Sequence, residues 1–181
     1  MDAFPTLRTE RLILRQFLPS DAGDLQRLAG AKEVAAGTFL PHPYEDGVAE
    51  RWIAGLQQDY DSGKAVHFAV VLTIDRALLG SIGLDIAAAH RHARIGYWLG
   101  VPYWNRGYGT EAVRAVLGYG FTALQLHRIC GPHFAGNAAS GRVLQKAGMT
   151  YEGRLRGHYL RLGRFVDVEL YGILEAEFTA R

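Results

Sequence analysis

The residues most suited to chemistry lie in a glycine-containing segment, 106–110, between an apolar strand and an amphipathic helix. A helix start leaves backbone N–H groups without partners and carries partial positive charge, so it attracts phosphate. Gly107 and Gly109 have no side chains to hold an anion away from that backbone, and Arg106 adds a cation. The segment is therefore predicted to hold a diphosphate, although a glycine turn that merely starts a helix has the same spacing.

Two other phosphate-binding loops fit this segment less well. A P-loop requires Gly-Lys-Ser/Thr, which does not follow Gly107. The spacing Gly107-x-Gly109-x-x-Ala112 matches a dinucleotide fingerprint, but that fold also needs an acidic residue about 20 positions later. Residues 127–132 contain no Asp or Glu, so a nucleotide-dependent oxidoreductase is disfavoured.

A second segment, 137–149, has the pattern of a short helix with polar residues at its start. Asn137 is suited to cap this helix, and Gly148 to end it in the left-handed conformation. Ser140 follows one turn later, near the face of Asn137, and is expected to point toward a ligand on that helix end. Capping alone also explains Asn137 and Gly148.

The elements around these segments predict an α+β or α/β fold with a partly antiparallel sheet, because a meander is followed by helical crossovers. Strands are predicted at residues 12–15, 68–73, 79–86, 95–99, 127–131, 151–160 and 165–174, the last two joined by a turn at Gly163. Helices are predicted from a cap at Ser20 to about residue 30, at 46–60, around 113–121 and at 137–147. Glu111, in a first helical turn, is expected to favour the helix dipole.

Composition limits the class of protein. The 181 residues suggest one domain, 1–181, with 49% apolar and 21% charged residues, and a net charge of +2 gives no argument for direct nucleic-acid binding. The single cysteine, the lack of a basic-then-apolar leader and the lack of an apolar run of about 18 residues favour the cytoplasm and no membrane contact. No metal is expected, since His90 and His92 lack a third ligand at regular spacing.

The two segments together resemble the GNAT acetyltransferases, whose phosphate loop reads Gln/Arg-x-x-Gly-x-Gly/Ala. Gly107-x-Gly109 matches that loop, with Trp104 in place of the leading residue. This replacement resembles the RimJ/RimL-type branch, which contains the ribosomal-protein alanine acetyltransferases. Residues 7–15 (LRTERLILR), 96–99 (GYWL), 137–148, 151–155 (YEGRL) and 167–171 (DVELY) extend the resemblance over nearly the whole chain.

The resemblance implies a mixed, mostly antiparallel, twisted sheet with splayed central strands, flanked by helices. It also implies acetyl-coenzyme A as co-substrate, with the pantetheine on the backbone of 97–101, the diphosphate on 106–110, and Asn137 and Ser140 near the thiol. The cofactor contacts so implied are Trp98, Leu99, Gly100, Val101, Arg106, Gly107, Tyr108, Gly109, Thr110, Asn137 and Ser140.

Three residues depart from the family pattern. Leu144 stands where many of these enzymes have a general-acid Tyr, and Arg94 where the branch often has Glu. Tyr159 stands where some ribosomal-protein acetyltransferases have an acidic residue. Because of these departures, the family's general acid, base and substrate are not assigned directly to this chain. They leave a non-catalytic acyl-coenzyme A-binding module as an alternative.

The expected reaction is attack of a neutral primary amine on the thioester, with the oxyanion on the backbone N–H near Leu99. Ser140 first, and Tyr159 second, is expected to donate to the leaving thiolate. The base is expected to be a water held by His158, Tyr159 or Glu152. A protein N-terminal α-amine is favoured over a lysine, which costs about 4 kcal/mol to deprotonate, and a small-molecule amine remains open. The protein is expected to act as a monomer or homodimer.

Overall fold

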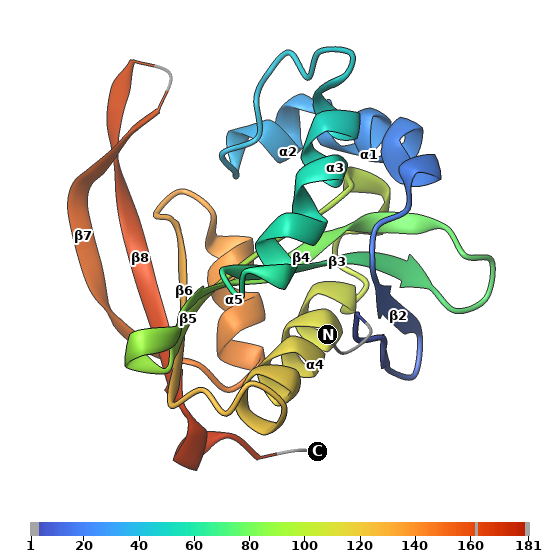
Figure 1. The fold of residues 1–181 in the computed structure, drawn as a ribbon. Coiled ribbons are helices and arrows are strands. Elements are labelled where there is room, and N and C mark those ends of the chain that lie inside the picture. Colours follow the sequence, from blue (N-terminus) through green and yellow to red (C-terminus); the bar gives the residue numbers. More distant parts are fainter. Residues whose placement is uncertain (1–3, 162, 180–181) are drawn as a thin grey trace.

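Runs of Val, Ile and Leu along the chain form one mixed sheet with helices on both faces (Figure 1). This computed structural model describes residues 4–161 and 163–179. The strand order is β1-β2-β3-β4-β5-β6-β8-β7, and every neighbouring pair is antiparallel except β5 and β6. The mixed, mostly antiparallel sheet is therefore confirmed.

The strands are β1 (Leu7–Arg8), β2 (Leu12–Arg15), β3 (Ala65–Leu72), β4 (Leu78–Ala87), β5 (His92–Leu99), β6 (Arg128–Phe134), β7 (Thr150–Arg161) and β8 (Arg164–Leu174). The helices are α1 (Ala22–Ala29), α2 (Lys32–Ala36), α3 (Val48–Asp61), α4 (Tyr108–Thr122) and α5 (Ala138–Lys146). Short 3₁₀ turns lie at Pro19–Asp21, Ala88–His90, Val101–Tyr103 and Glu175–Glu177.

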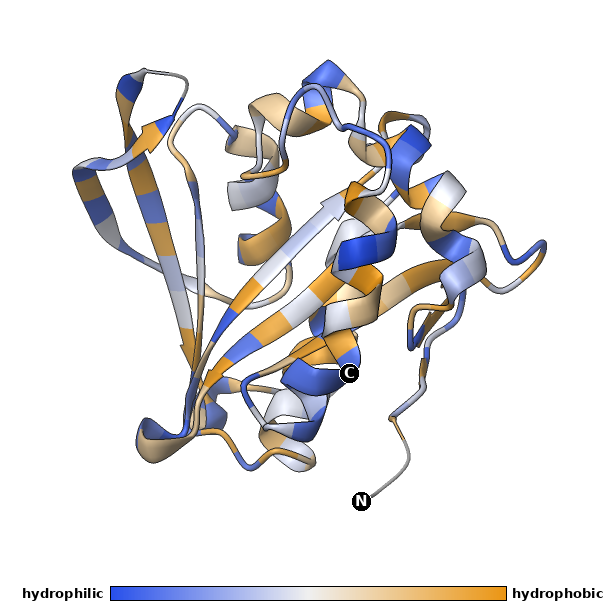
Figure 2. Ribbon diagram, turned by 45° about the horizontal axis from the view of Figure 1, so that its top comes forward, coloured by the Kyte–Doolittle hydropathy of each residue, from blue (hydrophilic) through white to orange (hydrophobic). Residues whose placement is uncertain are grey.

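Each face of the sheet has its own apolar core, because strand side chains alternate between faces. On one face, Phe68 and Leu84 pack with Leu117 of α4. On the other face, Ala69 packs with Ile53 of α3. The apolar stripes of strands and helices are the orange segments in Figure 2. Burial of each large side chain contributes about 1.5–3 kcal/mol, so both helix layers are fixed to the sheet.

Several local features differ from the sequence predictions, among them strand β1, which was not predicted. Ser20 does not cap the first helix but lies in a 3₁₀ turn, and α1 begins after Asp21. The Asp21 carboxylate instead accepts two bonds from Arg15, at 2.7 and 2.9 Å. The short helix α2 was not predicted, and β5 begins three residues early because His92 pairs with Arg128.

Two predictions touch positions outside the described residues. The prediction that the N-terminus carries no leader rests in part on residues 1–3. The predicted turn at Gly163 adjoins residue 162. In the described part, no helix is both long and apolar enough to cross a membrane. No group of three or more His, Cys, Asp or Glu among residues 4–161 and 163–179 is arranged to hold a metal ion.

The two parallel strands at the centre of the sheet, β5 and β6, pair over only a short distance. Their ladder runs from His92–Arg128 to Arg94–Cys130, and both strands then continue without pairing with each other. Beyond that point β6 pairs with β8 alone, so the backbone edge of residues 95–99 in β5 faces a gap. The strands fan out from one lower corner in Figure 2. The predicted splay is therefore confirmed.

The start of α4 is tied to the turn between β1 and β2 by one carboxylate. Glu111 accepts hydrogen bonds from the Thr9 hydroxyl (2.6 Å), the Arg11 backbone N–H (2.9 Å) and Arg11 Nε (2.8 Å). Arg11 Nη2 lies 2.7 Å from the same carboxylate, and Arg11 Nη1 donates to the carbonyl of Arg106 (3.0 Å). We call Thr9, Arg11 and Glu111 the Glu111 clamp, which holds the loop before α4 in place.

The clamp predicts a pH-dependent stability. Partial burial raises the pKa of Glu111, but the bonds from Thr9 and Arg11 and the Arg11 charge outweigh it, so the pKa lies below its usual value. The clamp therefore stabilises the fold above the unfolded pKa of Glu, about 4.3, and the contribution is lost as the pH falls through the lowered folded pKa. We expect Glu111→Gln to lower the free energy of unfolding by about 1 kcal/mol at pH 7 and by almost nothing at pH 2, measured by urea denaturation.

Glu50→Gln is the matched control. Glu50 also lies in a first helical turn after a left-handed glycine, Gly47 (φ 78°), but it has no such clamp among the described residues. A loss for Glu50→Gln equal to that for Glu111→Gln would show that only the helix dipole is involved.

Candidate active site

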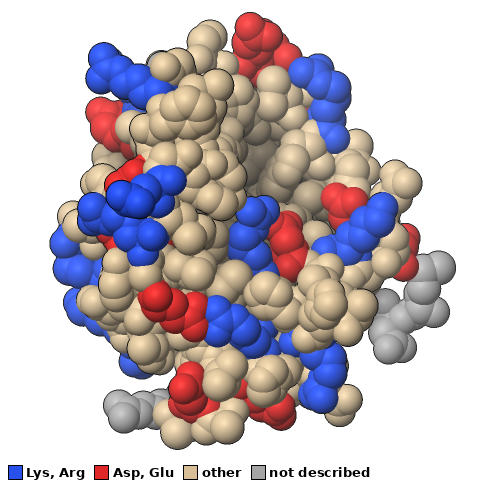
Figure 3. Space-filling view, turned by 90° about the vertical axis from the view of Figure 1, so that its left-hand side faces the viewer, with Lys and Arg blue, Asp and Glu red and all other residues tan. Residues whose placement is uncertain are grey.

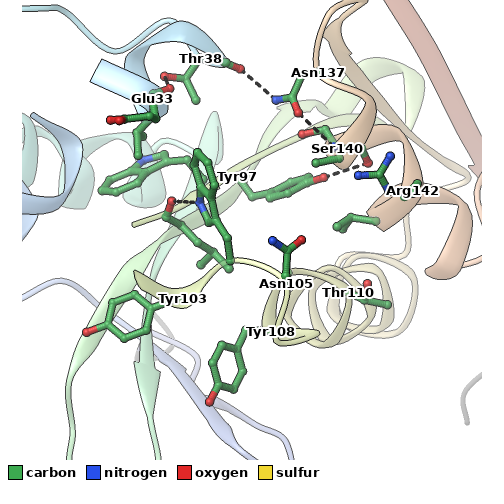
Figure 4. Close-up of a pocket in the computed structure, with 18 of the residues that line it drawn as sticks. Glu33, Thr38, Tyr97, Tyr103, Asn105, Tyr108, Thr110, Asn137, Ser140 and Arg142 are labelled. Atoms are coloured by element: carbon green, nitrogen blue, oxygen red, sulfur yellow. Dashed lines mark hydrogen bonds between the residues drawn. The ribbon is translucent and has the colours of Figure 1, made fainter. Parts of the chain in front are cut away.

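A cavity of about 690 Å³ lies where the open half of β5 faces the starts of α4 and α5 (Figure 4). Helix α2 and the residues after it close its other side. The residues predicted from the sequence that line this first cavity are Trp98, Leu99, Gly107, Tyr108, Gly109, Thr110, Asn137 and Ser140. Gly100, Val101 and Arg106 were also predicted, and they do not line it.

The first turn of α4 presents free backbone donors to this cavity. Gly107 precedes the helix with φ 82°, a conformation that favours glycine. The Glu111 N–H donates to the Gly107 carbonyl (3.1 Å), which closes the first turn. The N–H groups of Tyr108, Gly109 and Thr110 precede that bond and have no helix carbonyl to accept them. This end of the cavity therefore suits an anion.

Positive side chains at the first cavity come from α5. Arg142 and Lys146 line the cavity, and Figure 4 shows Arg142 beside the start of α5. Arg106, which was predicted to supply the positive charge, is exposed. Its backbone carbonyl accepts a hydrogen bond from Arg11 Nη1 (3.0 Å). The sequence spacing predicted that the start of α5 faces a ligand, but not that Arg142 and Lys146 further along the helix also line the cavity.

The edge of β5 offers backbone groups to the same cavity. The Gly100 N–H donates to the Leu79 carbonyl of β4 (2.8 Å). Because bonding directions alternate along a strand, the N–H and C=O of Leu99 face the opposite way, into the gap. The Leu99 carbonyl accepts a bond from Trp104 Nε1 (2.7 Å), and the Leu99 N–H has no β6 partner.

Tyr97 of β5 meets the first turn of α5 across the gap. Asn137 caps α5, since its Oδ1 accepts the Ser140 N–H (3.2 Å), and its Nδ2 donates to the Gly37 carbonyl (3.4 Å). The Tyr97 hydroxyl donates to the Ser140 carbonyl (3.2 Å). Burial raises the pKa of Tyr97 to about 12, and the bond to Ser140 opposes this only in part, so the hydroxyl stays protonated at neutral pH.

A second cavity, of about 330 Å³, adjoins the first at the gap, and six residues line both. The residues that line both cavities are Gly37, Thr38, Tyr97, Trp98, Phe134 and Ser140. The apolar walls of the second cavity are Phe39, Leu40, Trp52, Ile95, Phe134, Leu144 and Val168. Figure 3 shows a hollow on the β7–β8 side of the molecule, bordered mainly by uncharged atoms. The two cavities thus adjoin at the splay.

Three charged or titratable side chains of the second cavity lie on the neighbouring strands β3, β4 and β5, and Tyr159 of β7 lies beside one of them. Asp85 of β4 accepts bonds from Arg94 of β5, at 2.8 Å from Nη2 and 3.2 Å from Nε. His67 Nε2 of β3 lies 3.7 Å from Asp85 Oδ1. The Tyr159 hydroxyl lies 3.5 Å from Arg94 Nη1, and the Tyr159 ring packs edge-on against Phe39 (4.7 Å between centroids).

Sequence reasoning did not single out His67 and Asp85, and of the three residues it named to hold a basic water, Tyr159 lines the second cavity. Glu152 pairs with Arg128 through both carboxylate oxygens and lines neither cavity. His158 is exposed and packs edge-on against Tyr159 without lining either cavity. One feature of the sequence could have pointed to Asp85. Arg94 stands where the branch often has Glu, and an Arg within a strand is expected to pair with a carboxylate on the neighbouring strand.

The comparisons with known proteins agree with this geometry. The family model for the acetyltransferase (GNAT) domain matches residues 11–150. The chain is 33% identical to the N-acetyltransferase YoaA of Bacillus subtilis, over 95% of this chain and 98% of that protein. It is 23% identical to the ribosomal protein uS5-alanine N-acetyltransferase of Escherichia coli, over 96% of this chain and 92% of that protein.

A solved structure of Mycobacterium smegmatis RimJ with CoA-disulfide superposes with a TM-score of 0.84. Its sequence identity is 26%, and the match covers 99% of this chain and 90% of that one. Sequence, topology and the break between β5 and β6 therefore lead to one conclusion: the chain belongs to the GNAT family of N-acetyltransferases.

Proposed function

We propose that this acetyltransferase acts on the α-amine of a protein N-terminus, with acetyl-coenzyme A in the first cavity and the amine in the second. The observation that supports the proposal is that the two cavities share six lining residues at the break in the sheet, and we take this as the passage between them. A thioester from one side and an amine from the other meet at that passage.

In this proposal the diphosphate binds the N–H groups of Tyr108, Gly109 and Thr110, and Arg142 and Lys146 supply positive charge. The pantetheine extends along the open edge of β5 toward the passage. The oxyanion of the tetrahedral intermediate binds an N–H on that edge, at Leu99 or two residues further from the loop at Tyr97. Such a donor contributes roughly 3–4 kcal/mol to catalysis.

Ser140 is the proposed donor to the leaving thiolate, since it lines both cavities. A coenzyme thiolate resembles a Cys thiolate with pKa about 8.5, so one hydrogen bond is sufficient help. Tyr97 lies at the same passage, but its hydroxyl is bound to the Ser140 carbonyl (3.2 Å). Tyr159 lines the second cavity but not the first and lies beside Arg94, so we assign it to binding the amine substrate.

The charge in the second cavity favours a monoamine over a polyamine. In the described part of the chain, Asp85 is the one carboxylate that lines this cavity, and Arg94 is already bound to it. A polyamine would bring several positive charges against Arg94 with little to balance them. An α-amine needs less help to lose its proton than a lysine, because its pKa is about 7.7–8.0 rather than 10.4.

An acceptor panel tests this proposal. The purified protein and acetyl-coenzyme A are incubated with a peptide that begins with Ala, the same peptide with a blocked N-terminus and one Lys, and spermidine. We expect kcat/KM for the free α-amine to exceed that for the lysine by about 100-fold at pH 7.4, with the acetyl group located by mass spectrometry. Preference for spermidine or the blocked peptide would contradict the protein N-terminus as acceptor.

A glycine substitution tests the diphosphate site. Gly107→Ala places a Cβ at φ 82° and 3.2 Å from Arg11 Nη2, a strain of about 1–2 kcal/mol that shifts the loop. We expect the KM for acetyl-coenzyme A to rise about tenfold while the KM for the amine is unchanged. Gly47→Ala carries the same left-handed strain (φ 78°) at the start of α3, so it is expected to lower the melting temperature without changing either KM. Equal effects of both variants on KM would argue against the diphosphate site.

A further inference from the structure

One row of residues, His67, Gly83 and Gly96, crosses three strands of the sheet and leaves open space above its last residue. His67 of β3 pairs with Gly83 of β4, and Gly83 pairs with Gly96 of β5. Residues directly opposite each other share one face of a sheet, so the imidazole lies on the face from which two side chains are absent. All three residues line the second cavity. The imidazole therefore lies over Gly83, and open space lies over Gly96 between it and the open edge of β5.

Gly83 accommodates the imidazole. A Cβ on Gly83 would lie 2.3 Å from His67 Nδ1, so any larger residue would displace the ring. The edge of the Trp52 ring packs on the imidazole (5.8 Å between centroids), and the His67 side chain is 24% exposed. The ring is thus fixed in direction, with Nε2 on the side of Asp85 at 3.7 Å. That distance is too long for a direct hydrogen bond and leaves Nε2 able to accept a proton.

The surroundings of His67 keep its imidazole neutral and also stabilise the imidazolium when a proton arrives. Burial lowers the pKa of His67, and the charges of Asp85 and of Asp59 on α3 oppose that shift without cancelling it. On β5, Arg94 is bound to Asp85 (2.8 Å), and on β2, Arg15 is bound to Asp21 (2.7 Å). The imidazole is therefore unprotonated at neutral pH, and a proton arriving on it meets the Asp85 carboxylate.

We propose that His67 is the general base that deprotonates the acceptor amine, and that Asp85 is a positioning residue that stabilises the imidazolium. The proposal rests on the proposed function of the two cavities. The base His67 lies on β3, and its partner Asp85 lies on β4. On β5, Arg94 stands where the branch often has Glu, so the acidic residue common there is replaced by one of opposite charge.

The step balances as follows. An ammonium substrate gives one proton to His67 Nε2, which later releases it to water. The nitrogen lone pair then attacks the thioester carbon, the C–N bond forms and the C–S bond breaks. A second N–H proton leaves the new amide and is balanced by protonation of the coenzyme A thiolate, for which Ser140 is the adjacent hydroxyl.

The test is the pH profile of kcat/KM for an Ala-initiated peptide. If His67 removes a proton from the ammonium form, the wild-type profile is flat from below pH 6.5 up to the pKa of the peptide amine, near 8. His67→Gln can use only free amine, so its profile rises tenfold per pH unit through that interval. At pH 7 we expect an activity loss of about 100-fold. The melting shift with acetyl-coenzyme A should equal that of the wild type, which shows that the variant is folded.

Two further variants separate catalysis from structure. His67→Ala opens space beside Gly83, and added imidazole is expected to restore activity several-fold. Asp85→Asn removes the charge that raises the His67 pKa. The fall in kcat/KM on the acidic side of the profile, where His67 becomes protonated, is therefore expected to move to lower pH. His90→Gln, in an exposed turn, is the control expected to retain the wild-type rate and profile.

The outcomes are distinct. A wild-type profile in His67→Gln, with no rescue of His67→Ala by imidazole, would overturn the base while leaving the acetyltransferase proposal intact. A wild-type protein that acetylates no amine in the panel would overturn the proposed function, and the base with it.

Discussion

The site depends on the point where the β5–β6 ladder ends. After Arg94 and Cys130 the two strands separate, and the backbone on the open side of β5 loses its partner strand. Unpaired backbone groups in a protein interior are costly unless something bonds to them. Trp104 satisfies the carbonyl of Leu99, and the remaining groups face a cavity large enough for an extended cofactor arm. Residues at the same gap line both cavities, so one break in pairing creates the open edge of β5 and the place where the two cavities adjoin.

Rigid contacts on either side hold that gap open. The Glu111 clamp fixes the loop before α4, while Tyr97 and Asn137 fix the first turn of α5 through bonds to Ser140. Each helix start is thereby held against a different part of the sheet. A site of this kind needs its donors placed before the substrate arrives, because reorganising them during the reaction would cost activation energy.

The sequence predicted the elements that depend on local chemistry and missed those that depend on strand register. The glycines at 107 and 109, the Asn137 cap and most strands follow from local pattern, and the structure places them as predicted. The facing of Asp85 and Arg94 required knowing that β4 and β5 pair at those residues. His67 was missed for the same reason, because the two glycines beside it lie 16 and 29 residues later in the chain. Arg106 showed the converse error, since a cation near a loop in sequence need not point into it.

The central claim is that a diphosphate on the first turn of α4 directs a thioester into the gap between β5 and β6. A crystal structure of the protein with acetyl-coenzyme A tests it most directly. The account predicts diphosphate oxygens within hydrogen-bonding distance of the N–H groups of residues 108–110, and the thioester between Tyr97 and Ser140. Coenzyme bound elsewhere, or a thioester that lies away from the gap, would contradict the account.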